Sequence, residues 1–90
     1  MTQQNKIEKH ADQILHTINY MAKEDNDCCR DTVLGYMDAY DSFIGDFKED
    51  IPAILLQEIR TSTKRICKKY NIDTDRFYGI FPQQGEEEEE

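Results

Sequence analysis

Residues 27–49 sort their side chains onto two opposite faces when the segment is wound into an α-helix. At ~100° per residue, the apolar side chains fall within an arc of about 120°. They are Cys29, Val33, Tyr36, Met37, Tyr40, Phe43, Ile44 and Phe47. The carboxylates of Asp27, Asp31, Asp38, Asp41 and Glu49 fall within about 80° of each other on the opposite side. This segment is therefore predicted to be an amphipathic helix with a core face and an acidic face.

Two other segments repeat apolar side chains at helical spacing. The first covers residues 4–23 and the other runs from Pro52 to about Tyr70. The polar residues 24–27 break the first helix and supply N-cap side chains for the second. Asp50 is expected to cap the third helix, with Pro52 in its first turn. Connections of about 3 to 6 residues favour antiparallel neighbours.

The segment after the third helix is short and strongly apolar. Residues 77–81 contain Phe77, Tyr78, Ile80 and Phe81, and Pro82 stops any helix there. We expect these side chains to close one open end of the helical core; otherwise they form an apolar patch for a partner. No segment alternates apolar and polar residues as a strand would.

The sequence therefore predicts an all-α fold, a small antiparallel three-helix bundle with a short C-terminal fourth segment. Residues 1–82 form the bundle domain, and residues 83–90 form a disordered acidic tail. The predicted core consists of Ile7, Ile14, Leu15, Ile18, Met21, Val33, Tyr36, Met37, Tyr40, Phe43, Ile44, Phe47, Ile51, Leu55, Ile59, Ile66, Tyr70 and Phe77.

Charge and cysteine content narrow the function classes. The chain of 90 residues has a net charge of −8, and five of its acids form the run Glu86–Glu90. The rest of the chain has 14 acids and 11 bases, so its net charge is also negative. A negative net charge disfavours nucleic acid and anionic membranes as partners. The odd count of three cysteines indicates reduced thiols, and no apolar run is long enough for a membrane span. A cytoplasmic location is expected.

No metal, cofactor or catalytic site is expected. An EF-hand loop starting at Asp25 would need glycine where Arg30 stands and glutamate where Tyr36 stands. Zinc is disfavoured because Cys28 and Cys29 are adjacent and no C-x-x-C pair exists. No nucleophile is paired with a base, and the aspartates are expected to be solvated, so we predict that the protein is not an enzyme.

Two surfaces are candidate interaction sites. Asp31, Leu34, Asp38 and Asp41 share the acidic face, which is either a solvated surface or a recognition surface for a basic partner. Leu34 stands among these carboxylates, as an apolar anchor does inside a polar rim. A second, basic surface consists of Arg60, Lys64 and Lys68, spaced by four. It is either solvated or pairs with the acidic face of another copy in a homodimer.

The order of these parts resembles one known family. The residues Pro52-Ala53-Ile54-Leu55-Leu56 open the third helix, and Lys69-Tyr70-Asn71-Ile72 end it. In this order, over residues 7–75, the chain resembles the small immunity proteins that protect producers of pediocin-like (class IIa) bacteriocins. Only 18 residues follow Ile72, whereas that family has a longer fourth helix. The resemblance implies a cytosolic antiparallel bundle that acts by binding, without catalysis.

These observations favour a non-enzymatic protein-binding module, an inhibitor or immunity-type factor such as bacteria and phages encode. Its contacts are expected at the acidic face, with Asp31, Leu34, Asp38 and Asp41 meeting a basic protein surface. The alternatives are a self-associating structural module and a small regulatory subunit of a larger complex.

Overall fold

The computed structural model describes residues 3–25 and 27–81. This part of the chain contains three α-helices, α1 (Gln3–Ala22), α2 (Arg30–Phe47) and α3 (Ala53–Tyr70), and no strand. Two single-turn 3-10 helices, η1 (Lys48–Asp50) and η2 (Thr74–Arg76), follow α2 and α3. The predicted all-α three-helix bundle with a short fourth segment is therefore confirmed.

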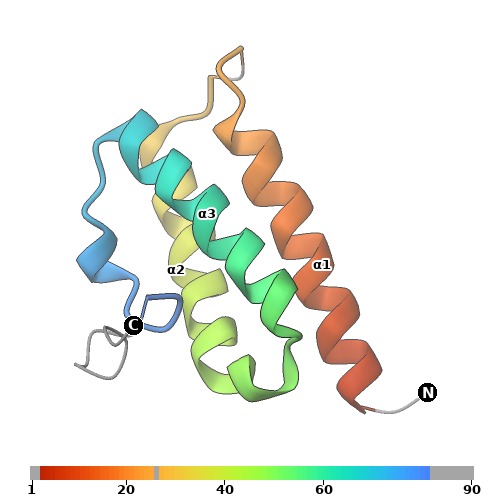
Figure 1. Ribbon diagram of the computed structural model, residues 1–90. Helices are drawn as coiled ribbons and strands as arrows, with labels where there is room; N and C mark the ends of the chain where they lie inside the picture. The colour runs from red at the N-terminus through yellow and green to blue at the C-terminus, as the bar shows by residue number, and fades with distance from the viewer. Residues whose placement is uncertain (1–2, 26, 82–90) are drawn as a thin grey trace.

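The three helices run alternately up and down. The ring of His10 in the first half of α1 contacts the ring of Phe43 near the end of α2, as an antiparallel arrangement requires. Figure 1 shows the chain rising through α1, descending through α2 and rising again through α3. α1 and α3 therefore run parallel, and the hydroxyl of Ser62 donates a hydrogen bond to Asn19 Oδ1 across their interface.

The start of α2 differs from the prediction. Residues 27–29 lie outside any helix, and Cys29 is the extended N-cap residue, so Asp25 and Asp27 do not cap α2. Contacts with the end of α3 fix this start. Arg30 Nε donates to the carbonyl oxygen of Tyr70 at 2.9 Å, and Arg30 Nη2 donates to that of Asn71 at 3.1 Å. The guanidinium thereby satisfies two carbonyls at the C-terminus of a helix, where a cation is favourable.

Both ends of α3 follow from local backbone chemistry. Pro52 occupies the N-cap position, with ψ of 141°, while Asp50 belongs to η1 and does not cap α3. The helix ends at Tyr70, as predicted, because Asn71 adopts the left-handed conformation with φ of 58°. The N–H of Ile72 then donates to the carbonyl oxygen of Cys67 at 2.8 Å, and Ile72 is buried beside the helix end.

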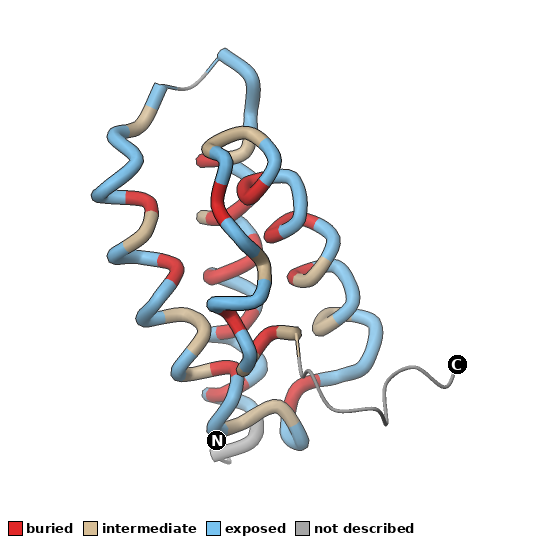
Figure 2. Tube along the Cα trace, turned by 90° about the vertical axis from the view of Figure 1, so that its left-hand side faces the viewer, coloured by how far each residue is buried: buried red, intermediate tan, exposed pale blue. Residues whose placement is uncertain are grey.

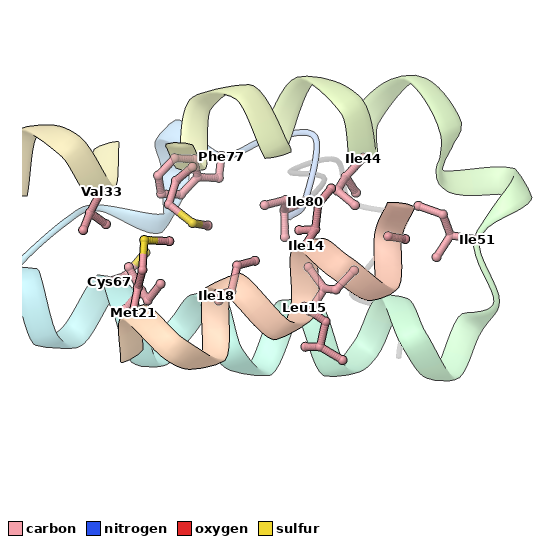
Figure 3. Close-up of a cluster of buried hydrophobic side chains, with 14 of the residues drawn as sticks. Ile14, Leu15, Ile18, Met21, Val33, Ile44, Ile51, Cys67, Phe77 and Ile80 are labelled. Atoms are coloured by element: carbon pink, nitrogen blue, oxygen red, sulfur yellow. The ribbon is translucent and has the colours of Figure 1, made fainter. Parts of the chain in front are cut away.

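The core lies along the inner faces of all three helices and includes the segment that follows them (Figures 2 and 3). Twelve predicted core residues are buried: Ile7, Ile14, Leu15, Ile18, Met21, Val33, Met37, Ile44, Ile51, Ile59, Ile66 and Phe77. Five others are half-buried and pack against this core: Tyr40, Phe43, Phe47, Leu55 and Tyr70. Ala11, Cys67 and Ile72 are also buried, although they were not among the predicted core residues, and Ile80, which was expected to help close one end of the core, is fully buried.

Tyr36 is the predicted core residue that was wrong. It is 50% exposed and stacks on the ring of Tyr40, with centroids 6.1 Å apart. The physical reason is a displaced buried face. Val33, Met37 and Ile44 are fully buried, so the buried face of α2 is centred near Met37. The segment that carries Phe77 and Ile80 is bound to Asp41, about 140° around the helix from Tyr36.

No helix of the described residues has the length and apolar composition that crossing a membrane requires.

Candidate functional site

The segment of residues 72–81 packs along the acidic side of α2, and this contact shapes the candidate site. The carboxylate oxygen Oδ1 of Asp41 accepts hydrogen bonds from the N–H of Gly79 at 2.8 Å and of Ile80 at 2.9 Å. Bonds from two successive amides to one carboxylate are charge-assisted and hold the segment in a fixed register on the helix. The segment covers the middle of α2, not one end of the bundle as the sequence analysis expected.

α3 holds the same segment from the other side. Arg60 Nε donates to the carbonyl oxygen of Ile80 at 2.6 Å. Ile80 therefore has its N–H bound to α2 and its carbonyl bound to α3, while its side chain is fully buried between them. A backbone unit that satisfies both polar groups and buries its side chain is a structural element of the core, although it belongs to no helix.

Two local turns allow the short segment of residues 72–81 to bury two of its side chains, those of Phe77 and Ile80, in the core. Asp73 caps η2 by accepting a hydrogen bond from the N–H of Asp75 at 3.0 Å. The N–H of Phe81 then donates to the carbonyl oxygen of Phe77 at 2.8 Å, which closes a single turn. Phe77 and Ile80 stand three residues apart in this turn, so both point inward (Figure 3).

Two glycines allow the segment to lie this close to α2. A Cβ on Gly45 would come within 3.2 Å of the Cα of Gly79, and a Cβ on Gly79 would overlap the carbonyl oxygen of Asp41. α2 continues past Gly45 to Phe47. The absence of a side chain at Gly45 allows the backbone of the segment to lie against the backbone of α2. Gly35 has no such neighbour, since a Cβ there would meet nothing within 4 Å.

The four predicted contact residues divide into two pairs. Asp31 lies in the first turn of α2 and is exposed. Leu34, which was expected to stand among these carboxylates as an apolar anchor, is half-buried and packs against the core of its own chain. Asp38 is exposed and pairs with Arg76, whose Nη2 lies 3.1 Å from Oδ2. Asp41 is half-buried and already bound to backbone amides. The segment thus partly covers the predicted acidic face.

A hollow of about 550 Å³ opens where the segment meets α2. Its walls include the carboxylates of Asp38, Asp41 and Asp46, and two cations, Lys48 and Arg76, also line it. The sequence-based prediction did not include Asp46, which lies five residues beyond Asp41 on α2. The hollow therefore carries a small excess of negative charge and suits a cationic side chain.

Tyr78 stands at the edge of this hollow, and sequence reasoning had assigned its ring to the core closure. Its side chain is 70% exposed, whereas its neighbours Phe77 and Ile80 are fully buried. Tyrosine carries a large rigid surface with a polar end and is enriched where proteins bind each other. The apolar composition of residues 77–81 gave no signal that would separate Tyr78 from its buried neighbours.

The predicted basic surface on α3 is intact only in part. Arg60 is half-buried, and its guanidinium donates a hydrogen bond to the carbonyl oxygen of Ile80. Lys64 and Lys68 are exposed, as expected.

The three cysteines are free, and their surroundings differ. Cys29 is exposed, and the backbone N–H groups of Thr32 and then Asp31 at the start of α2 lower the pKa of its thiol below the ordinary 9.0. Burial raises the pKa of the Cys67 thiol to about 11, with a smaller contribution from the charge of Asp73. The Cys29 thiol therefore ionises more readily than the buried Cys67 thiol, which is inert.

Within residues 3–25 and 27–81, no three His, Cys, Asp or Glu side chains come together as a metal site would require. The hollow beside Tyr78 is lined by neither a histidine nor a cysteine. Its lining of carboxylates, a serine and a tyrosine is suited to binding through charge and hydrogen bonds.

Comparison of the chain with protein families, with curated proteins and with solved structures gave no match.

Proposed function

We propose that this chain is a non-enzymatic protein-binding module, an inhibitor or immunity-type factor, that recognises a basic segment of a partner protein. The binding surface is the acidic side of α2 together with the segment that crosses it. The observation that carries the proposal is the hollow of about 550 Å³ that Asp38, Asp41 and Asp46 line together with the exposed Tyr78.

The geometry suits an arginine or lysine side chain of the partner. Asp41 is held rigidly by two amide N–H groups, so it presents a carboxylate whose position is fixed before binding. Tyr78 supplies an aromatic face beside it, which can pack on the aliphatic stem or the guanidinium of the incoming residue. Asp31 lies farther up α2 and extends the negative surface along the helix.

Arg76 occupies part of this surface in the free protein. Its guanidinium reaches both oxygens of Asp38, at 3.1 and 3.4 Å, in an ion pair that is about half exposed to solvent. An exposed pair of this kind contributes about 0–1 kcal/mol, so a partner arginine can displace it at small cost. In the absence of the partner, Arg76 thereby balances the negative charge of Asp38.

The place of action in this proposal is the cytoplasm. All three cysteines are free, and Cys28 and Cys29 stand next to each other in the connection before α2. Adjacent free thiols, of which Cys29 is exposed and Cys28 is half-buried, are typical of a reducing compartment.

Affinity capture with a matched control tests the proposal. The test variant combines Asp31→Lys, Asp46→Lys and Tyr78→Ala and leaves Asp41 intact, because Asp41 also holds the segment in place. The control carries Glu8→Lys and Asp12→Lys on α1, which are exposed positions outside the proposed surface.

We expect the wild-type chain and the control to capture the same partner, and the test variant to lose it by more than about tenfold. The captured protein should carry a basic segment at the contact. If the test variant keeps every partner of the wild-type chain, the acidic side of α2 is not the binding surface.

A further inference from the structure

The outer face of α3 is strongly basic, and the acids that line the adjoining hollows within the described residues are Glu24 and Glu58. Four of its side chains are cationic, Arg60, Lys64, Arg65 and Lys68, while Glu58 is the single acid within the helix. Lys64, Arg65 and Lys68 are exposed. Neither ion pair found in residues 3–25 and 27–81 involves any of these three side chains.

This basic face borders a groove between α1 and α3. Two hollows, of about 400 and 530 Å³, follow one another along the groove, and Arg65 lines both of them. Lys68 lines the second hollow, whose floor includes Ala22. An extended anionic segment that lies along α3 would therefore meet several cations in succession.

The described chain approaches one edge of this face. Ile80 is tied to Arg60 through its carbonyl oxygen, and the described residues end at Phe81. Along α3, Lys64 lies about 6 Å and Lys68 about 12 Å beyond Arg60, at 1.5 Å of rise per residue. The run Glu86–Glu90 begins five residues after Phe81, a span that an extended chain covers in at most about 17 Å.

We propose that the acidic run Glu86–Glu90 docks in cis on the basic face formed by Lys64, Arg65 and Lys68. Charge complementarity and reach both support this occupant: five consecutive carboxylates lie within reach of three cations that form no ion pair among residues 3–25 and 27–81. A tethered segment also competes at a high effective concentration, in the millimolar range for short linkers.

The consequence is a self-shielded surface. With the glutamate run in place, the basic face is closed to other polyanions and to the acidic face of a second copy. This docking does not depend on the partner proposed for α2, because it involves the opposite charge and another helix.

The test compares the full chain with a chain that stops after Gly85, which leaves Phe81 and the contact of Arg60 in place. Backbone amide NMR spectra of both are recorded at about 20 mM and about 500 mM salt, because exposed charges are screened at high ionic strength. We expect the deletion to shift the amide signals around Lys64, Arg65 and Lys68 at low salt, and to shift none of them at high salt.

Two variants separate this docking from a general charge effect. Lys64→Gln with Lys68→Gln should abolish the difference between the full and shortened chains, whereas Lys6→Gln with Lys9→Gln on α1 should retain it. Unchanged α3 signals after the deletion at low salt, or the same shifts in the Lys64/Lys68 variant, would overturn the proposal. Shifts that grow with protein concentration would show docking between two copies and would also overturn it.

Discussion

Gly79 in the C-terminal segment lies directly against Gly45 of α2, and a Cβ on either residue would intrude on the other backbone. This contact between two glycines brings the N–H of Gly79 to within 2.8 Å of the Asp41 carboxylate. It also sets the depth at which Phe77 and Ile80 enter the core. The segment can therefore hold its observed position along α2 only if Gly79 approaches the helix this closely.

Gly79→Ala should lower the free energy of unfolding by about 1–3 kcal/mol, because the new methyl group would overlap the carbonyl oxygen of Asp41. Urea unfolding followed by circular dichroism measures the loss. A variant as stable as the wild-type chain would show that the segment does not lie in this register.

Gly35→Ala and Gly45→Ala form a matched pair within α2. Alanine at Gly35 meets open space and should stabilise the protein by about 0.5–1 kcal/mol through helix propensity. Alanine at Gly45 gains the same propensity but presses on Gly79 at 3.2 Å, so its net effect should be smaller or destabilising. Equal gains from both substitutions, measured by thermal unfolding, would contradict the close approach.

Asp41→Ala should cost about 1–3 kcal/mol of stability because it leaves the amides of Gly79 and Ile80 without their acceptor. Asp41→Asn keeps an oxygen at the same place and should cost less. Asp46→Ala, an exposed position on the same helix, serves as the control and should change stability by less than about 0.5 kcal/mol. Equal effects of Asp41→Ala and Asp46→Ala would argue against the role of Asp41 as an anchor.

Thr63→Val should raise the free energy of unfolding by about 1 kcal/mol. Thr63 is fully buried on α3, and its hydroxyl oxygen finds no hydrogen-bond partner among the described residues. Valine has nearly the same shape and removes the polar atom. Thr61→Val, at an exposed position on the same helix, is the control. A loss of stability in Thr63→Val would mean that its hydroxyl has a partner.

Thiol labelling should distinguish the three cysteines. Cys29 should react fastest, and its rate should reach half its maximum below pH 9.0, since the helix N-terminus lowers its pKa. Cys67 should react only on unfolding, because it is buried and its pKa is raised to about 11. Mass spectrometry of the labelled peptides gives the order, and early labelling of Cys67 would contradict its burial.

The raised pKa of Cys67 also leads us to expect that the folded protein loses stability in alkaline solution. Its thiol ionises near the ordinary pKa of 9.0 in the unfolded chain, but only near 11 in the folded protein. Between these values the unfolded chain binds fewer protons than the folded protein, so stability falls as the pH rises. Thermal unfolding at several pH values measures this slope.

The sequence predicted the three helices because apolar side chains recur at the helical period in each of them. It also placed Phe77 in the core. It could not place the segment along the acidic side of α2, because helical periodicity describes one helix at a time and says nothing of a partner 38 residues away. Leu34 and Gly45 on that same side were the available signals, since an apolar residue and a glycine among carboxylates suit a face that something covers.

For the candidate site, the sequence correctly placed Asp38 and Asp41 on one side of α2, but not their different roles. Oδ1 of Asp41 accepts hydrogen bonds from the backbone of the chain itself, and Asp38 is paired with Arg76. Tyr78 was assigned to the core because its neighbours are apolar, although the single turn at 77–80 directs it outward. Such distinctions depend on tertiary geometry, which composition and spacing do not contain.

Gly79 and Ile80 are held between α2 and α3 by hydrogen bonds from both helices, and we propose that residues 77–80 form a fixed wall of the binding surface. Native-state hydrogen exchange of the Gly79 and Ile80 amides tests this most directly. We expect both amides to be protected nearly as strongly as the core amides of α2, and Asp41→Ala to release them. Exchange of Gly79 and Ile80 at the rate of an unstructured peptide in the wild-type chain would contradict the account.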